Sequence, residues 1–349
     1  MFVPVSGPFG MGEFARSSAI ARAVLERWPA AAIRFVLSRE APYAQQPPFE
    51  AILVPSSPTF HSGVVVDLIR TWRPHVVIFD NAGRTAQLAA AHGCGARVVY
   101  ISARRRQRRK AFRLRWMRLI DEHWIAYPQF IAGGLTLIER LKHRWLGRPT
   151  VRYLDVILSR ATPPPAPAQE SEPPTRGDFV LVVPGGGTGH PGVEDASEEF
   201  HEAARSLAEE GVPVRYVGPA RAAVHPASIV PARLESLGPL AQADLAELMR
   251  KARLIVVNGG STLLQAIACG AACVAVPIAG DQRERIRRCA AAGVAVEAPL
   301  AAAQIASKAL ALLRDEASRA ALAARAGSLA LADGVEIALR SLAPYIEPV

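Results

Sequence analysis

Short apolar runs that alternate with helix-like stretches, on both sides of a proline-rich segment, constrain the fold of this chain more than any other feature. In the N-terminal half, β-branched runs predict strands at 2–6, 33–38, 51–56, 75–80 and 97–102. Helix-like stretches lie between them, at 13–27, 62–72 and 84–92. Near-continuous apolar strands that alternate with helices indicate a parallel sheet covered on both faces.

The proline-rich segment, 161–177, contains polar residues and no apolar period, which is typical of an interdomain linker. Beyond it the alternation restarts, with strands expected at 179–185, 212–218, 253–260, 272–278 and 294–299. A helix is expected at 196–210, and an alanine-rich helical tail covers about 301–343.

We therefore predict an α/β chain with two Rossmann-like domains, at 1–160 and 178–330, that face each other across a cleft. A C-terminal tail, 331–349, could return to the first domain. Open parallel sheets bind ligands at the carboxyl ends of their strands, so the strand-to-helix loops should line the site.

Composition narrows the function classes. Hydrophobic residues make up 50% of the 349 residues, and no apolar run approaches the ~20 residues of a membrane-spanning helix. The N-terminus has no charged lead and no cleavage site, so a cytoplasmic protein is expected. The 4 cysteines form no CxxC pair and the 8 histidines show no metal-ligand spacing, so we expect no metal site and no cofactor. The net charge of +10 suggests an anionic partner.

The first candidate site follows the strand at 253–260. Gly259 and Gly260 allow a tight turn, and a helix begins directly after them. Backbone N–H groups at the start of that helix, with the hydroxyls of Ser261 and Thr262, can cradle a phosphate. Gln265 lies about one turn further on, where it could reach a ribose hydroxyl. The alternative is an ordinary turn with a Ser/Thr cap.

The next strand ends before Asp281 and Gln282, which precede a charged helix. A carboxylate beside an amide can accept from and donate to sugar hydroxyls together. The alternative is that Asp281 caps the helix.

These two segments, NGGSTLLQAIACG and VAVPIAGDQ, together resemble the donor signature of GT-B glycosyltransferases. The similar members are the UDP-glycosyltransferases and the peptidoglycan N-acetylglucosaminyltransferase that acts on a lipid-linked acceptor. The segment 238–249 also resembles their base-covering loop and the helix after it, and the resemblance covers most of 179–300.

The resemblance implies a nucleoside diphosphate sugar as donor, with UDP favoured and dTDP possible, and an inverting, metal-independent transfer. It assigns the diphosphate to Gly259, Gly260, Ser261 and Thr262. It places the ribose at Gln265, the transferred sugar at Asp281 and Gln282, and the nucleobase of the donor near Leu240. The chain departs from the family pattern at three positions: Asn258 replaces a histidine, Gln265 replaces a glutamate and Ala272 replaces a proline.

A glycine-rich turn also follows the strand at 179–185. Its backbone N–H groups suit a phosphate or a sugar ring, and the resemblance implies a contribution to the diphosphate site. The candidate residues are Gly186, Gly187, Thr188 and His190. A flexible loop with a solvated histidine is the alternative.

The general base is sought at the start of the chain, where the family has a glycine-rich loop that ends in a histidine. Here the loop contains Gly10, Met11 and Gly12, and Glu13 takes the position of that histidine. A carboxylate can remove the proton of the acceptor hydroxyl. Asp80, followed by Asn81 at the end of the strand at 75–80, is a rival base or a partner that orients the neighbours of Glu13 or the acceptor. His61 is a third candidate, for which a capping role is favoured.

The segment 104–120 is strongly basic, with Phe112 and Trp116 at helical spacing. A basic amphipathic helix of this kind could lie on the anionic inner face of the cytoplasmic membrane, which would suit a lipid-linked acceptor. It could also bind an anionic acceptor, while nucleic acid is less favoured. The alternative is a solvated face whose aromatic residues lie in the core.

The favoured function is thus glycosyl transfer to a hydroxyl or other nucleophilic acceptor. A nucleotide-sugar hydrolase or epimerase on the same fold is one alternative. A catalytically degenerate nucleotide-binding protein is another, because of Asn258 and Gln265.

Overall fold

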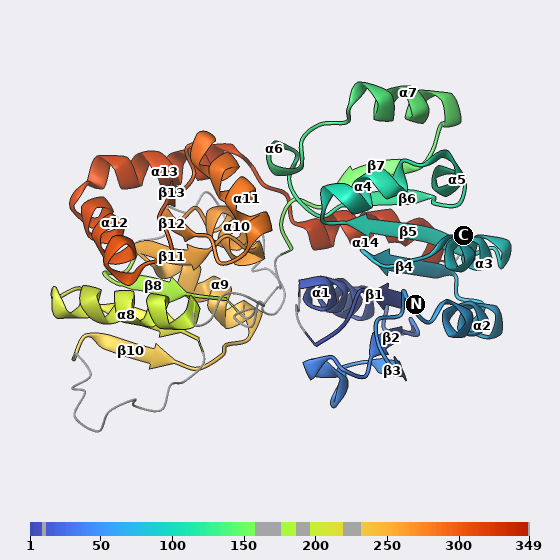
Figure 1. Ribbon diagram of the computed structural model, residues 1–349, viewed down its shortest axis with the longest axis horizontal. Helices are drawn as coiled ribbons and strands as arrows, with labels where there is room; N and C mark the ends of the chain where they lie inside the picture. The colour runs from blue at the N-terminus through green and yellow to red at the C-terminus, as the bar shows by residue number, and fades with distance from the viewer. Residues whose placement is uncertain (9–11, 158–175, 186–195, 219–231, 348–349) are drawn as a thin grey trace. The chain divides into compact units, whose positions relative to one another are not determined.

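The computed structural model describes the chain apart from residues 9–11, 158–175, 186–195, 219–231 and 348–349 (Figure 1). The chain forms two compact units. Unit 1 consists of Met1–Ile157 and Ala332–Val349, and unit 2 consists of Leu158–Leu331. The predicted linker 161–177 lies outside the described residues except for Arg176 and Gly177.

Unit 1 contains a parallel sheet of seven strands in the order β3-β2-β1-β4-β5-β6-β7. Its strands are β1 (Phe2–Pro4), β2 (Arg34–Ser38), β3 (Glu50–Val54), β4 (Val76–Asp80), β5 (Arg97–Ser102), β6 (Glu122–Ile125) and β7 (Thr150–Tyr153). Its helices are α1 (Gly12–Arg27), a 3-10 turn (Pro42–Ala44), α2 (Ser62–Trp72), α3 (Thr85–Gly93), α4 (Arg105–Ala111), α5 (Leu114–Met117), α6 (Gln129–Ala132), α7 (Leu137–Leu146) and α14 (Gly334–Ile346).

Side chains of this sheet alternate between two cores, as expected for a sheet covered on both faces. One core joins the sheet to α2 and α3, through Val3, Phe79, Tyr100, Ile69 and Leu88. The other joins it to α1 and α14, through Phe2, Ile78, Ile20, Ala338 and Leu342. The C-terminal helix therefore packs beside the first helix of the chain (Figure 1).

Unit 2 contains a parallel sheet of six strands in the order β10-β9-β8-β11-β12-β13. Its strands are β8 (Val180–Val183), β9 (Val214–Val217), β10 (Leu234–Leu237), β11 (Leu254–Asn258), β12 (Cys273–Val276) and β13 (Val296–Glu297). Its helices are α8 (Ala196–Glu209), α9 (Gln242–Lys251), α10 (Ser261–Ala268), α11 (Gly280–Ala291), α12 (Ala302–Arg314) and α13 (Glu316–Ser328).

Both sheets have the same topological switch point. The first strand of each unit, β1 or β8, lies next to the second strand on one side and the fourth on the other. The chain leaves these neighbouring strands in opposite directions, which opens a binding crevice at their carboxyl ends. The prediction of an α/β chain with two Rossmann-like sheets is confirmed.

Three strands were not predicted from the sequence. β6, β7 and β10 have four residues each and mix charged with apolar side chains. The alanine-rich tail is not one helix but three, α12, α13 and α14. No helix among the described residues has the length and apolar character needed to cross a membrane.

The prediction of a single basic amphipathic helix over 104–120 needs correction. The segment forms two short helices, α4 and α5. Phe112 and Trp116 are 2% and 3% exposed, since they pack into unit 1. The aromatic residues expected on a lipid-facing side are therefore in the interior, while Arg104, Arg105, Arg106 and Arg109 stay exposed.

Candidate functional site

The switch point of unit 2 is closed by Asn258, the last residue of β11. Its Nδ2 donates to the Pro184 carbonyl, after β8, at 2.6 Å. Its Oδ1 accepts from the Gly260 N–H at 2.9 Å. The side chain is 5% exposed and thus binds two adjacent loops together. An amide can donate and accept at once, which explains how asparagine serves where the resembling family has histidine.

Gly259 permits a close approach that no other residue would allow. A Cβ there would lie 2.6 Å from Ile286 Cδ1 and 2.9 Å from Gln282 Cβ. Gln282 uses its Oε1 to accept from the Gly259 N–H at 3.1 Å and from the Ile278 N–H at 3.0 Å. Since Gln282 is 5% exposed, its carbonyl holds the two turns of the site in place.

Arg285 was not singled out from the sequence, yet it brings a cation to this turn. Its guanidinium is 7% exposed and donates to the Gly259 carbonyl. It also lies 3.4 Å from the carboxylate of Asp281, one helical turn earlier on α11. The Asp281 side chain is 54% exposed, so it remains open to solvent beside the turn.

The N-cap residue of α10 offers no side chain to its first N–H groups. Gly260 occupies that position without a side-chain cap bond, and its own N–H donates to Asn258 Oδ1. The first N–H groups of a helix have no partner within the helix, and the dipole adds positive potential. Ser261 is exposed, and Thr262 and Gln265 are half-buried on the same short helix. An anion is the ligand that this arrangement suits.

Other predicted donor residues lie nearby in the fold or outside the described part. Leu240 is half-buried in the loop between β10 and α9. Gly185, at φ +88°, is the last described residue of the glycine-rich turn, and a Cβ there would overlap the Asn258 amide. Outside the described residues lie Gly186, Gly187, Thr188 and His190.

The switch point of unit 1 holds the predicted carboxylate Glu13, in the first turn of α1. Its Oε1 accepts from Asn81 Nδ2 at 2.8 Å. Asn81 follows β4 at φ +52°, a left-handed conformation that asparagine tolerates well, and its Oδ1 accepts from the Ala103 N–H at 2.8 Å. The fold therefore brings Glu13 and Asn81 into contact, although they are 68 residues apart. Gly12 begins α1, while Gly10 and Met11 lie outside the described residues.

Asp80 lies in an environment that suits the orienting role. Its side chain is 0% exposed and forms a bidentate pair with Arg16, at 2.6 and 2.9 Å. Ser17 donates a further bond at 3.3 Å. Burial raises the pKa of Asp80 to about 6, although Arg16 lowers it. The Asp80 carboxylate is thus enclosed by Arg16 and Ser17, an environment that favours a positioning group over a base.

His61, the third candidate, also has a structural environment. Its Nε2 accepts from the Ser56 N–H at 3.1 Å and lies 2.9 Å from Ser56 Oγ. His61 occupies the N-cap position of α2 but makes no side-chain cap bond; its ring instead closes the loop before that helix. No group of three or more His, Cys, Asp or Glu side chains that could hold a metal occurs in the described part of the chain.

Solved structures share this two-sheet architecture over nearly the whole chain. The spinosyn rhamnosyltransferase SpnG matches with a TM-score of 0.65 and 15% identity, over 98% of this chain and 100% of that one. MurG of Acinetobacter baumannii matches with a TM-score of 0.64 and 15% identity, over 98% and 99%. The chain has the GT-B fold.

A further GT-B match is a protein from Listeria monocytogenes assigned as a UDP-N-acetylglucosamine 2-epimerase. It has a TM-score of 0.59 and 16% identity, over 98% of this chain and 94% of that one. No protein-family model matches the sequence, and no curated protein does. Identity at this level shows the GT-B fold alone, so activity must be argued from the residues at the two switch points.

Arg16 is the other residue of the GT-B framework that sequence reasoning missed. It lies on α1 among Ser17, Ser18, Ala19 and Ile20, all of which are buried. A single arginine within a run of small and apolar helical residues was the available signal. Its partner Asp80 is 64 residues away, so the pairing itself was not visible in the sequence.

Proposed function

We propose that this protein is a glycosyltransferase that moves a sugar from a nucleoside diphosphate sugar, with UDP favoured, to a nucleophilic acceptor. The observation that carries the proposal is the uncapped N-terminus of α10 behind the Gly259–Gly260 turn. Several solved structures with this fold are named as glycosyltransferases, including a rhamnosyltransferase and a forosaminyltransferase.

In this proposal, the first N–H groups of α10 bind the donor diphosphate, helped by the hydroxyls of Ser261 and Thr262. Preorganised donors of this kind stabilise the negative charge that develops as the diphosphate departs. Arg285, held against the Gly259 carbonyl, adds a nearby positive charge. Gln265 would bind the ribose, Leu240 would pack near the base, and Asp281 would accept from the hydroxyls of the sugar.

Glu13 would act as the general base of an inverting transfer. The carboxylate is half-buried, and Asn81 holds Oε1 in place. The other oxygen, Oε2, would take the proton of the acceptor hydroxyl while that oxygen attacks the anomeric carbon. The bond from the anomeric carbon to the diphosphate oxygen breaks in the same step, and its electrons leave with the diphosphate.

A nucleotide-sugar hydrolase or epimerase is a second candidate. The match to the Listeria protein favours it, since that protein is assigned to a UDP-sugar reaction without an acceptor. Water could then take the place of the acceptor hydroxyl at the same site. The donor turn would serve either reaction, so the products decide between them.

The first experiment is the thermal midpoint of the protein with UDP, dTDP or GDP. A ligand that binds only the folded state stabilises it by about 2.7 kcal/mol at a hundredfold excess over Kd. We expect one nucleotide to raise the midpoint, and Thr262→Ala or Gln265→Ala to reduce the rise. Glu13→Gln is the matched control, because it lies in unit 1 and should keep the full nucleotide shift while losing turnover.

The absence of a shift with all three nucleotides would contradict the proposal at its foundation. If a shift is present, the matching nucleotide sugar is incubated with the protein and the products are identified. Free sugar or a 2-epimer without an acceptor would select the second candidate. Turnover that requires an added acceptor would select the transferase.

A further inference from the structure

Helix α7 exposes its apolar face to solvent. Leu137, Ile138, Leu141 and Trp145 are 75%, 68%, 74% and 68% exposed. At 3.6 residues per turn these four side chains fall on one face of the helix. The one buried residue of α7 is the charged Glu139. A surface helix ordinarily does the reverse, so this apolar face lacks a partner among the described residues.

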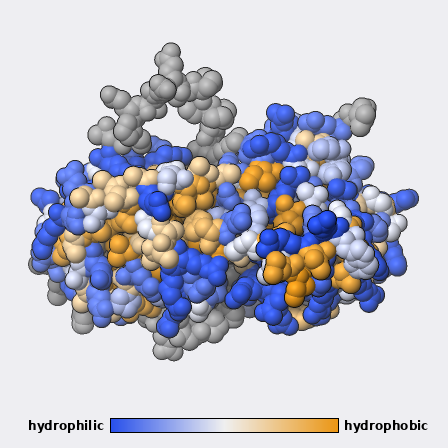
Figure 2. Space-filling model, turned by 90° about the horizontal axis from the view of Figure 1, so that it is seen from above, coloured by the Kyte–Doolittle hydropathy of each residue, from blue (hydrophilic) through white to orange (hydrophobic). Residues whose placement is uncertain are grey.

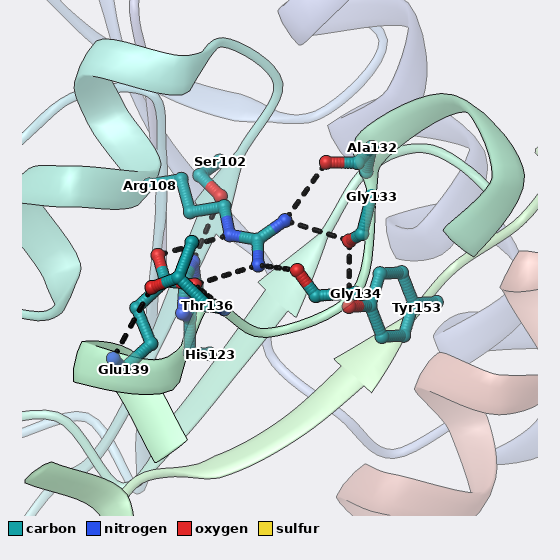
Figure 3. Close-up of polar contacts among 9 residues, drawn as sticks. All are labelled: Ser102, Arg108, His123, Ala132, Gly133, Gly134, Thr136, Glu139 and Tyr153. Carbon is teal, nitrogen blue, oxygen red and sulfur yellow. Dashed lines mark hydrogen bonds and ion pairs between the residues drawn. The ribbon is translucent and has the colours of Figure 1, made fainter. Parts of the chain in front are cut away.

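Polar contacts fix this orientation of α7 (Figure 3). Glu139 accepts two bonds from Arg108 of α4, at 2.8 and 3.2 Å, and forms a capping box with Thr136. Arg108 also donates to the carbonyls of residues 132, 133 and 134. Lys142 Nζ donates to the Phe112 carbonyl at 3.2 Å. The helix is therefore held by its charged side, and the apolar side points away from these contacts.

The surroundings of α7 are strongly cationic. The segment 104–148 contains 13 Lys and Arg but 3 Asp and Glu, so it accounts for the whole net charge of +10. All three acids, Asp121, Glu122 and Glu139, are engaged in ion pairs with arginines. By contrast, no ion pair with a described carboxylate occurs for these exposed residues: Arg105, Arg109, Arg113, Arg140 and Arg144.

The surface combines the two properties in one place. Figure 2 is viewed from the side on which α7 lies in Figure 1, and on its right an apolar patch is bordered by strongly hydrophilic residues. An apolar helix face with a cationic rim matches a surface that is anionic outside and apolar beneath. A second copy of this chain would present the same cationic rim, so charge repulsion disfavours a homodimer through α7.

We propose that α7 docks unit 1 on an anionic phospholipid bilayer, with its apolar face inserted at the boundary between headgroups and acyl chains. Arg140 and Arg144 would lie at the lipid phosphates. This contact does not depend on the glycosyltransferase proposal, because it involves no residue of either switch point. In this proposal α7 makes the membrane contact itself. The segment 104–120 contributes the surrounding positive charge and Arg108, which anchors α7.

The test is co-sedimentation of the full chain with vesicles of phosphatidylcholine alone or mixed with phosphatidylglycerol. We expect tighter binding to the anionic vesicles and weaker binding at high salt. Leu141→Asp should weaken binding about tenfold to a hundredfold, the effect of one lost leucine insertion. Each of Arg140→Gln and Arg144→Gln should weaken it about fivefold.

Phe60→Asp is the matched control, since Phe60 is 71% exposed but lies outside α7. Binding to anionic vesicles should not change in this variant. The fluorescence of Trp145 gives a second readout: vesicles should shift wild-type emission to the blue, and Trp145→Ala should lose most of that shift. Because these side chains are exposed, the variants should keep the wild-type circular dichroism and thermal midpoint.

Equal vesicle binding by wild type and Leu141→Asp would overturn the proposal. So would a wild type that ignores vesicles but is dimeric by light scattering and becomes monomeric in Leu141→Asp, which would assign the face to a second copy. Nucleotide-induced stabilisation is measured on the same samples. If no nucleotide stabilises the protein while vesicle binding is intact, the proposed function is rejected and the docking of α7 is still supported.

Discussion

The switch points of the two units share one plan and differ in charge. In each, the residue that ends the fourth strand reaches the loop or helix that follows the first strand. In unit 1 this residue is Asp80, which forms a fully buried ion pair with Arg16. In unit 2 it is Asn258, whose neutral amide bridges the Pro184 carbonyl and the Gly260 N–H.

This difference indicates what each unit can bind. Asn258 bridges the two loops of unit 2 with a neutral amide, so it adds no negative charge at the positive end of α10, which favours a phosphate ligand. The ion pair in unit 1 fixes α1 against β4, and the next residue, Asn81, then holds the Glu13 carboxylate. In the proposed function, unit 1 would then supply the proton acceptor and unit 2 the anion site.

The largest effect is expected from Asp80→Asn, which would leave the buried Arg16 cation without its partner. Breaking one side of a buried ion pair costs about 3–5 kcal/mol in the free energy of unfolding. Urea unfolding measures the loss, and hydrogen exchange should locate it at α1 and β4. Asp281→Asn is the control in unit 2, because that carboxylate is 54% exposed and its pair should contribute less than about 1 kcal/mol.

A loss below that of the control would show that the charged bridge is not what holds unit 1 together. Adding Arg16→Gln to Asp80→Asn removes the stranded cation. The double variant should therefore be more stable than Asp80→Asn alone, and the difference measures the coupling between the two side chains.

Gly259→Ala tests the neutral switch point with a smaller expected effect. The added Cβ would lie 2.6 Å from Ile286 and 2.9 Å from Gln282, so the turn or α11 must shift. Overpacking of this kind costs about 1–3 kcal/mol. Chemical unfolding checks the change, with Gly280→Ala as the control because nothing lies within 4 Å of a Cβ there. Equal stability of the two variants would mean that the close approach at Gly259 is not required.

The sequence predicted the framework of these sites well, because apolar runs of five or six residues mark central parallel strands. It missed β6, β7 and β10, where four-residue strands contain charged side chains such as Glu122, Arg152 and Glu235. Buried polar residues of β6 have partners far along the chain: Ser102 for His123 and Arg152 for Glu122. Such partners are set by the sheet and are absent from the local pattern.

The site residues show the same limit. Their places after strands pointed to Asn81 and Gly259, whereas Glu13 and Asn258 were compared with histidine positions of the resembling family. Neither signal showed which carboxylate would be enclosed, because Glu13 and Asp80 differ in burial through tertiary packing alone. The outward apolar face of α7 was likewise not predicted, since its direction depends on the distant contact between Arg108 and Glu139.

The smallest expected effect is a loss of stability at low pH that is confined to unit 1. His123 of β6 is 0% exposed, and burial lowers its pKa to about 3 from an ordinary value of 6.5, with help from Arg108. Neutral His123 therefore contributes its full stabilisation of the folded protein above pH 6.5. This stabilisation is lost as the pH falls toward 3, because the unfolded chain takes up the proton first. In unit 2, burial instead raises the pKa of Cys289 to about 12, so this thiol does not titrate in acid.

Asp80 acts in the opposite direction, because its raised pKa of about 6 favours protonation of the folded state as pH falls. The histidine must therefore be isolated by comparing wild type with His123→Gln. Between about pH 7.5 and 5.5 the stability advantage of wild type over the variant should shrink by about 1 kcal/mol. Hydrogen exchange should place this change in unit 1, around β5 and β6, and leave the amides of β11 and β12 unaffected. A constant difference across this range would mean that His123 is hydrated or charged in the folded protein, and the predicted acid sensitivity at β5 and β6 would then be wrong.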